Sequence, residues 1–184
     1  MATFGIDYTN CPVFLYCENG ENLCRTTITE YDKDSKLIQL AEYPDDLDIG
    51  DSCRLLIMTE PSPREYRGRV RTDYSGKAIA LFSGREKEDR GATRYKVNIV
   101  ARIEYMIREG KAHALQEPIE IQLINISTTG MRFFAPLKVL QNGDRFQTRV
   151  SISNEAKLLI AEIVNHRENE SDFAEYGCRF LIAS

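Results

Sequence analysis

The feature that most constrains the fold is the lack of a helical pattern along the chain. No segment of the sequence repeats apolar side chains with a 3.6-residue period for more than about two turns. Short β-prone runs, such as residues 13–17 and 52–58, recur instead at roughly ten-residue spacing. Polar clusters such as residues 32–35 separate the runs, because Asp, Asn, Ser and Gly tolerate the backbone angles of tight turns. The sequence therefore predicts an all-β protein.

The β-prone runs fall into two groups of about six, separated by an almost fully charged segment at residues 83–89. Strands of this length and spacing are typical of small barrels or sandwiches. We therefore predict two small β-barrels in series, with a short linker between them. The predicted domains are residues 1–86 and residues 87–184.

Composition excludes several classes of protein. The formal net charge of −4 argues against a DNA-binding protein, which usually has a strongly basic balance. The five cysteines form no CxxC pair and only two histidines are present, so we expect no metal site. No run approaches eighteen apolar residues, and residues 1–25 lack a signal-peptide pattern. We therefore expect a cytoplasmic protein with reduced thiols and no membrane insertion.

The first chemical motif is Arg90-Gly-Ala-Thr-Arg94, which lies just before an alternating strand-like run. Arginine forks bind phosphate and the guanine edge in bidentate fashion, so the pair is a candidate anion site. The RxxxR spacing is weak evidence alone, because it recurs at Arg67/Arg71 and Arg145/Arg149. Those pairs fit within strands, where the spacing repeats one solvated face. A solvated linker end is the alternative interpretation of Arg90 and Arg94.

The second motif is Asn125-x-Ser127-x-x-Gly130, which follows the alternating residues 119–123. Asn and Ser are common turn formers, and Gly permits a positive φ or a close backbone approach. By itself the motif is also compatible with a plain hairpin turn.

The two motifs together, in this order and spacing, resemble the PilZ domain, the bacterial receptor module for cyclic di-GMP. Such domains have RxxxR at their start and (D/N)xSxxG after a following strand, on a six-stranded barrel. Tyr176-Gly177-Cys178-Arg179-Phe180 is similar to the C-terminal strand of the family. The resemblance covers residues 87–184. The N-terminal half is similar in architecture to the split barrel of YcgR-like, flagellar-brake PilZ proteins.

The resemblance implies a cyclic di-GMP site made by Arg90, Arg94, Asn125, Ser127 and Gly130. It also implies a regulatory protein without enzymatic activity or cofactor, in which ligand binding changes the orientation of the two barrels and the binding of an unidentified protein partner. The partner would belong to the flagellar motor or to polysaccharide machinery, with motility favoured. Two departures are visible: position 125 is Asn where many relatives have Asp, and the chain ends soon after the last predicted strand, where many relatives continue into a helix.

Two other classes stay open at this level. One is a PilZ-like scaffold that binds partners without nucleotide, and the other is a split-barrel enzyme with a flavin in the N-terminal half. Catalysis has little support, because His113 and His166 have no Ser or Cys motif partner and no phosphate-binding loop occurs. A row of arginines at positions 67, 69 and 71 is interpreted as a solvated strand face, with a protein-contact role as the alternative.

Overall fold

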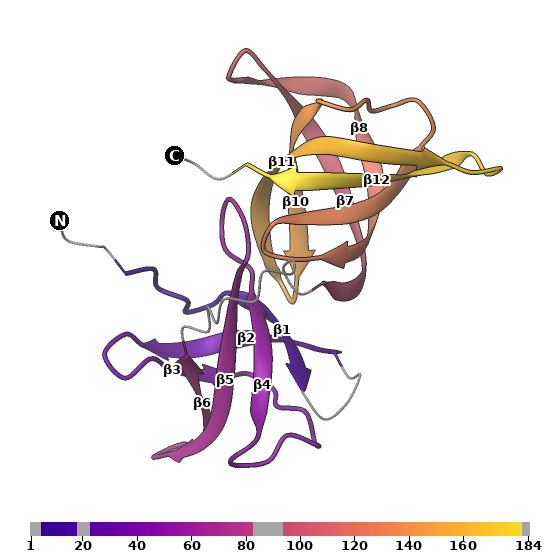
Figure 1. Ribbon diagram of the computed structural model, residues 1–184. Helices are drawn as coiled ribbons and strands as arrows, with labels where there is room; N and C mark the ends of the chain where they lie inside the picture. Colours follow the sequence, from indigo (N-terminus) through magenta and orange to yellow (C-terminus); the bar gives the residue numbers. More distant parts are fainter. Residues whose placement is uncertain (1–4, 18–22, 83–93, 182–184) are drawn as a thin grey trace. The chain divides into compact units, whose positions relative to one another are not determined.

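The structure is a computed structural model, and it describes residues 5–17, 23–82 and 94–181 (Figure 1). Twelve strands make up its regular structure. The first six are β1 (Pro12–Cys17), β2 (Leu23–Asp32), β3 (Leu37–Leu40), β4 (Ser52–Ile57), β5 (Arg64–Asp73) and β6 (Gly76–Phe82). The other six are β7 (Tyr95–Arg108), β8 (Lys111–Ile126), β9 (Gly130–Pro136), β10 (Arg145–Ile152), β11 (Glu155–Glu168) and β12 (Phe173–Phe180).

The strands close into two antiparallel barrels, as the sequence predicts. The first barrel has the order β1-β2-β3-β6-β5-β4, and β4 pairs with β1 to close it. The second has the order β10-β11-β12-β9-β8-β7, and β7 pairs with β10 to close it. Closure gives every strand of each barrel a neighbour on both sides, which removes most of the sheet edge that could pair with another chain.

The chain divides into two compact units, residues 1–59 with 64–91 and residues 60–63 with 92–184. The domain boundary predicted between residues 86 and 87 lies outside the described residues, as does the linker predicted at residues 83–89. Both therefore stay predictions.

The first barrel has its own apolar core, which alternate residues of its strands fill. Val13, Leu15 and Leu55 are fully buried and belong to one cluster of buried side chains. Three tyrosines pack at this core: the Tyr8 ring lies 5.0 Å from that of Tyr31 and 5.6 Å from that of Tyr66. The hydroxyls of Tyr8 and Tyr66 are hydrogen-bonded.

The second barrel is filled by alternate residues of β7 to β12, so one face of each strand is buried and the other faces outward. Phe133 stacks on Tyr176 with ring centroids 5.6 Å apart, and meets Phe146 edge to face at 5.9 Å. All three aromatic side chains are almost fully buried. This aromatic group fixes which face of β9 and β12 points inward.

Two details of the second barrel differ from the sequence-based expectation. β8 begins at Lys111, well before the predicted start at residue 119, and pairs with β7 in a hairpin whose tip extends beyond the barrel (Figure 1). Its residues 111–118 are almost all exposed, so no alternating pattern marked them as a strand. The apolar sequence of residues 137–140 suggests a single helical turn, but these residues form a turn and a bend, so that interpretation is wrong.

Among the described residues, no helix is long and apolar enough to cross a membrane.

Candidate functional site

The turn between β8 and β9 is organised by the hydroxyl of Ser127. This buried Oγ accepts hydrogen bonds from the backbone N–H groups of Thr129 at 3.2 Å and Gly130 at 3.3 Å. It lies 3.2 Å from both the Gly130 carbonyl oxygen and the Thr129 Oγ1, either of which can accept its proton. The backbone N–H of Ser127 donates to the Gly130 carbonyl at 2.9 Å. A hydroxyl has one donor and two acceptor positions, so the turn itself uses the Ser127 side chain.

Gly130 is needed at this turn because of a close backbone approach. A Cβ at position 130 would lie 2.0 Å from the Cys178 carbonyl oxygen and 3.2 Å from the Arg179 Cα. The backbone of Gly130 is not in the positive-φ region, where Gly50, Gly76, Gly110 and Gly143 lie. The glycine of the second motif therefore lets β9 run directly against β12, and a positive φ is not the reason for it.

Strand register brings the described part of the first motif to the second. Tyr95 pairs with Ile126, so Arg94 directly precedes this pair on one strand and Ser127 directly follows it on the other. The Arg94 side chain is exposed. Arg90 lies outside the described residues, so its position relative to the turn stays a prediction.

Asn125 lies on the outer face of the barrel. It is half-buried, whereas its neighbour Ile126 is fully buried and points inward. The pairing between β8 and β9 is irregular between Leu123 and Asn125, a bulge of the kind that re-aims side chains near binding sites. The structure gives the Asn125 amide no hydrogen bond to another described residue.

The register also gives Asn125 two basic neighbours that motif spacing did not reveal. Lys96 is its partner on β7 and Arg132 is its partner on β9. Lys96 is exposed and Arg132 is half-buried. To predict that Lys96 and Arg132 lie beside Asn125, one needs the inward–outward alternation of side chains in β7 and β9 and also the correct strand register.

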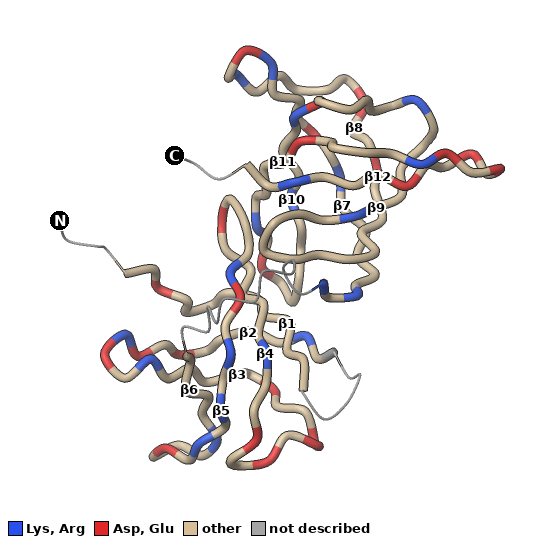
Figure 2. The backbone as a smooth tube through the Cα atoms, in the orientation of Figure 1, with Lys and Arg blue, Asp and Glu red and all other residues tan. Residues whose placement is uncertain are grey.

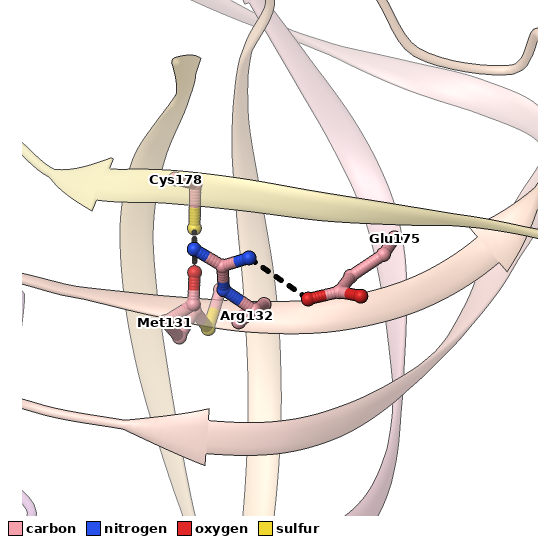
Figure 3. A network of polar contacts seen from close by, with 4 residues as sticks. All are labelled: Met131, Arg132, Glu175 and Cys178. Carbon is pink, nitrogen blue, oxygen red and sulfur yellow. Dashed lines mark hydrogen bonds and ion pairs between the residues drawn. The ribbon is translucent and has the colours of Figure 1, made fainter. Parts of the chain in front are cut away.

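Arg132 forms an ion pair with Glu175 of β12, and Nη1 lies 2.8 Å from Oε1 (Figure 3). Next to this pair, a shallow hollow of about 420 Å³ opens on the outer face of the same barrel. Phe134, Gln122 and Phe173 are among its lining residues. The paired arginine thus lies beside Asn125, and the partly aromatic depression lies farther along β8 and β9.

The third sequence motif, residues 176–180, is the β12 strand. Tyr176, Cys178 and Phe180 are buried in the barrel core, and Arg179 is exposed. The Cys178 thiol donates to the Met131 carbonyl oxygen, with Sγ 3.3 Å from it (Figure 3). Burial raises the pKa of this thiol to about 12, so it stays protonated and unreactive near neutral pH.

Residues 1–86 carry a net charge of −5, from 10 basic and 15 acidic side chains, and residues 87–184 carry +1, from 14 and 13. Figure 2 shows acidic and basic positions interspersed, without a broad field of one sign. An anion site on the second barrel therefore depends on a few local side chains. No group of three or more His, Cys, Asp or Glu side chains suited to a metal ion occurs within the described residues.

The two histidines lie at different places in the second barrel. His166 contacts Asn142 Oδ1 through Nδ1 at 2.9 Å, and its ring stacks on Tyr176 with centroids 6.0 Å apart. His113 is exposed near the tip of the β7–β8 hairpin.

Several solved structures are similar to the chain at low sequence identity. An inhibitor of motility from Bacillus subtilis, MotI/DgrA, has 14% identity over 98% of this chain and 91% of that chain, with a TM-score of 0.40. MrkH of K. pneumonia in complex with c-di-GMP has 13% identity over 95% and 80%, with a TM-score of 0.38. YcgR from Escherichia coli in complex with c-di-GMP has 15% identity over 95% and 77%, with a TM-score of 0.38.

No curated protein matches the sequence. The family model of the PilZ domain matches residues 85–184, which include both motifs and all six strands of the second barrel. This match covers more than half of the chain and confirms the resemblance read from the motifs. The chain therefore belongs to the PilZ domain family.

Proposed function

We propose that the chain is a cyclic di-GMP receptor without enzymatic activity, and that it binds the nucleotide on the outer face of its second barrel. The observation that carries the proposal is the register of β7 and β8. It places Arg94 and the Asn125–Gly130 turn at one end of the same strand pair, in a barrel of the PilZ family.

The chemistry of each side chain suits this ligand, which has two phosphates and two guanines. The forks of Arg90 and Arg94 would bind phosphate or the O6/N7 edge of guanine. The amide of Asn125 offers both a donor and an acceptor to a guanine edge. Ser127 and Gly130 would act mainly by shaping the turn, because the Ser127 hydroxyl is used within it and Gly130 permits its close approach to β12.

The proposed output is a change in the orientation of the two barrels, followed by altered binding of a protein partner. This rests on the place of the RxxxR motif, which lies between the last strand of the first barrel and the first strand of the second. A ligand that orders a connecting segment is a known route to a large rearrangement. We propose motility as the controlled process, with a partner in the flagellar motor and a cytoplasmic location.

The direct test is isothermal titration of the purified chain with cyclic di-GMP. The wild type should bind with micromolar or tighter affinity, and the Arg90→Ala, Arg94→Ala double variant should lose binding. The double variant Arg67→Ala, Arg71→Ala is the matched control, because it removes two arginines at the same spacing from β5. It should bind as the wild type does.

A second candidate is a PilZ-like scaffold that binds its partner without nucleotide. The saturated hydroxyl of Ser127 favours it, since that side chain has no remaining position for a ligand. Absence of binding by a folded wild-type protein would replace the receptor proposal with this one. Equal loss of binding in the Arg67, Arg71 control would contradict the assignment to Arg90 and Arg94.

A further inference from the structure

The Arg132–Glu175 ion pair lies in the middle of the outer face that contains Asn125. The Arg132 and Glu175 side chains are 29% and 23% exposed, so the pair is partly withdrawn from solvent. Figure 3 shows the guanidinium of Arg132 reaching from β9 to the carboxylate of Glu175 on β12. Only Nη1 donates to Glu175 in this arrangement. Four of the five N–H groups of a guanidinium thus stay outside this bond.

Arg132 adjoins the second motif directly. It follows Gly130 by two residues and pairs with Asn125 on β8 and with Gly177 on β12. Side chains on the same face of paired strands lie about 5 Å apart at Cβ, so a ligand on Asn125 comes within reach of the Arg132 side chain. The Asn165 side chain of β11 covers Gly177, with its Oδ1 only 2.5 Å from where a Cβ of residue 177 would lie, so the ligand would approach Arg132 from the side of Asn125.

The next residues on the same face of β8, β9 and β12 include two that line the hollow. Phe134, two residues after Arg132, pairs with Gln122 and with Glu175. Phe134 and Gln122 both line the hollow of about 420 Å³, together with Phe173. Arg132 therefore stands between the turn and a depression with an aromatic wall, where a phosphate and a neighbouring base would both contact it.

The negative charge of Glu175 affects how strongly this surface can bind an anionic ligand. An unpaired carboxylate at this place would repel an anionic ligand, and the low exposure of the pair reduces screening by water. The bond to Arg132 neutralises Glu175, but it also occupies part of the guanidinium. A bound phosphate and the Glu175 carboxylate thus compete for one cation.

We propose that Arg132 is a further ligand-binding residue of this site, an inference that rests on the proposed function. Glu175 sets the affinity of the site because its carboxylate competes with the ligand for the Arg132 guanidinium. Arg132 contacts the phosphate or guanine edge of the nucleotide beside Asn125. Glu175 holds Arg132 when the site is empty and shares it when the site is filled.

The test is titration of the full chain with cyclic di-GMP for the wild type and the variants Arg132→Gln, Glu175→Gln and the double variant. Arg132→Gln should weaken binding at least tenfold, because the cation that contacts the ligand is lost while the Glu175 carboxylate stays. Glu175→Gln should bind several-fold more tightly than the wild type. The double variant should bind more weakly than the wild type but more tightly than Arg132→Gln.

Arg149→Gln is the matched control, because it makes the same charge change on an exposed side chain of β10, which does not pair with β8 or β9. Its affinity should equal that of the wild type. Melting temperatures of all variants, followed by circular dichroism, separate loss of fold from loss of binding.

Wild-type affinity in Arg132→Gln, with a lowered melting temperature, would show that the pair only joins β9 to β12 and would overturn the inference. Unchanged or weaker binding by Glu175→Gln would overturn the competing role of Glu175. A folded wild type that does not bind cyclic di-GMP would instead refute the proposed function itself, so the two failures are distinguishable.

Discussion

Gly130 marks the point where the turn after β8 meets the backbone of β12. A methyl group there would lie 2.0 Å from the Cys178 carbonyl oxygen, a backbone atom that cannot move without shifting the strand. We expect Gly130→Ala to lower the free energy of unfolding by about 1–3 kcal/mol or more, as other overpacked sites do. Urea unfolding would measure it. Gly5→Ala is the control, since nothing lies within 4 Å of its added Cβ. A change below about 0.5 kcal/mol for Gly130→Ala would contradict the steric account.

Also at the residue scale, Glu162 joins two arginines on the outer face of the second barrel. A hydrogen bond from Arg179 at 3.0 Å, aided by the charges of Arg179 and Arg145, holds the pKa of Glu162 below its usual 4.5. A lowered folded-state pKa gives stability that is present above pH 4.5 and is lost as the pH falls through the lowered value.

We therefore expect Glu162→Gln to melt below the wild type at pH 7, with the difference shrinking as the pH falls below 4.5. The effect should be small, because the three side chains are at the surface. Melting curves between neutral and acidic pH would test this, with the exposed Glu170→Gln as a charge-matched control. A difference that is constant with pH would contradict the ionic explanation.

At the scale of elements, an aromatic group joins β9, β10 and β12. Phe133 is fully buried between Tyr176 and Phe146. Truncating a buried aromatic side chain leaves a cavity, so Phe133→Ala should cost about 3–5 kcal/mol of unfolding free energy. Chemical denaturation would measure the loss, and Phe173→Ala, at a residue 51% exposed, should cost far less. Equal costs for the two variants would refute the importance of the aromatic group.

At the scale of elements, the start of β8 could not be predicted correctly from the sequence. Its alternation is visible from Ile119 onward, where one face enters the barrel core. Residues 111–118 pair with β7 but bury neither face, so no apolar period marks them. Hairpin pairing beyond a core leaves little trace in the sequence.

At the scale of the whole molecule, two barrels with separate strand sets are joined in series. If nucleotide binding reorients them, small-angle X-ray scattering of the wild type should change when cyclic di-GMP is added. The Arg90→Ala, Arg94→Ala variant should give the same profile with and without ligand. Identical profiles for a wild type that titration shows to be saturated would rule out reorientation and leave partner binding to a local surface change.

Local sequence patterns are sufficient to predict the all-β class, the two groups of about six strands, and the motif pair that resembles the family. These are local properties, because alternation and turn chemistry act between residues close in the chain. The resemblance then extended them to a six-stranded barrel, which the structure confirms for the second half. The ligand-binding role of Arg90, Arg94, Asn125, Ser127 and Gly130 stays a prediction.

Which strands pair, and in which register, could not be predicted from the sequence and is known only from the fold. Register places Arg132 opposite Asn125, brings Glu175 to Arg132, and sets Gly130 against the backbone of Cys178. Cys178 lies almost fifty residues from Gly130 along the chain, so no local pattern could report this approach. Barrel closure is a sum of such long-range pairings, and its consequences for single side chains appear only once every strand has its neighbours.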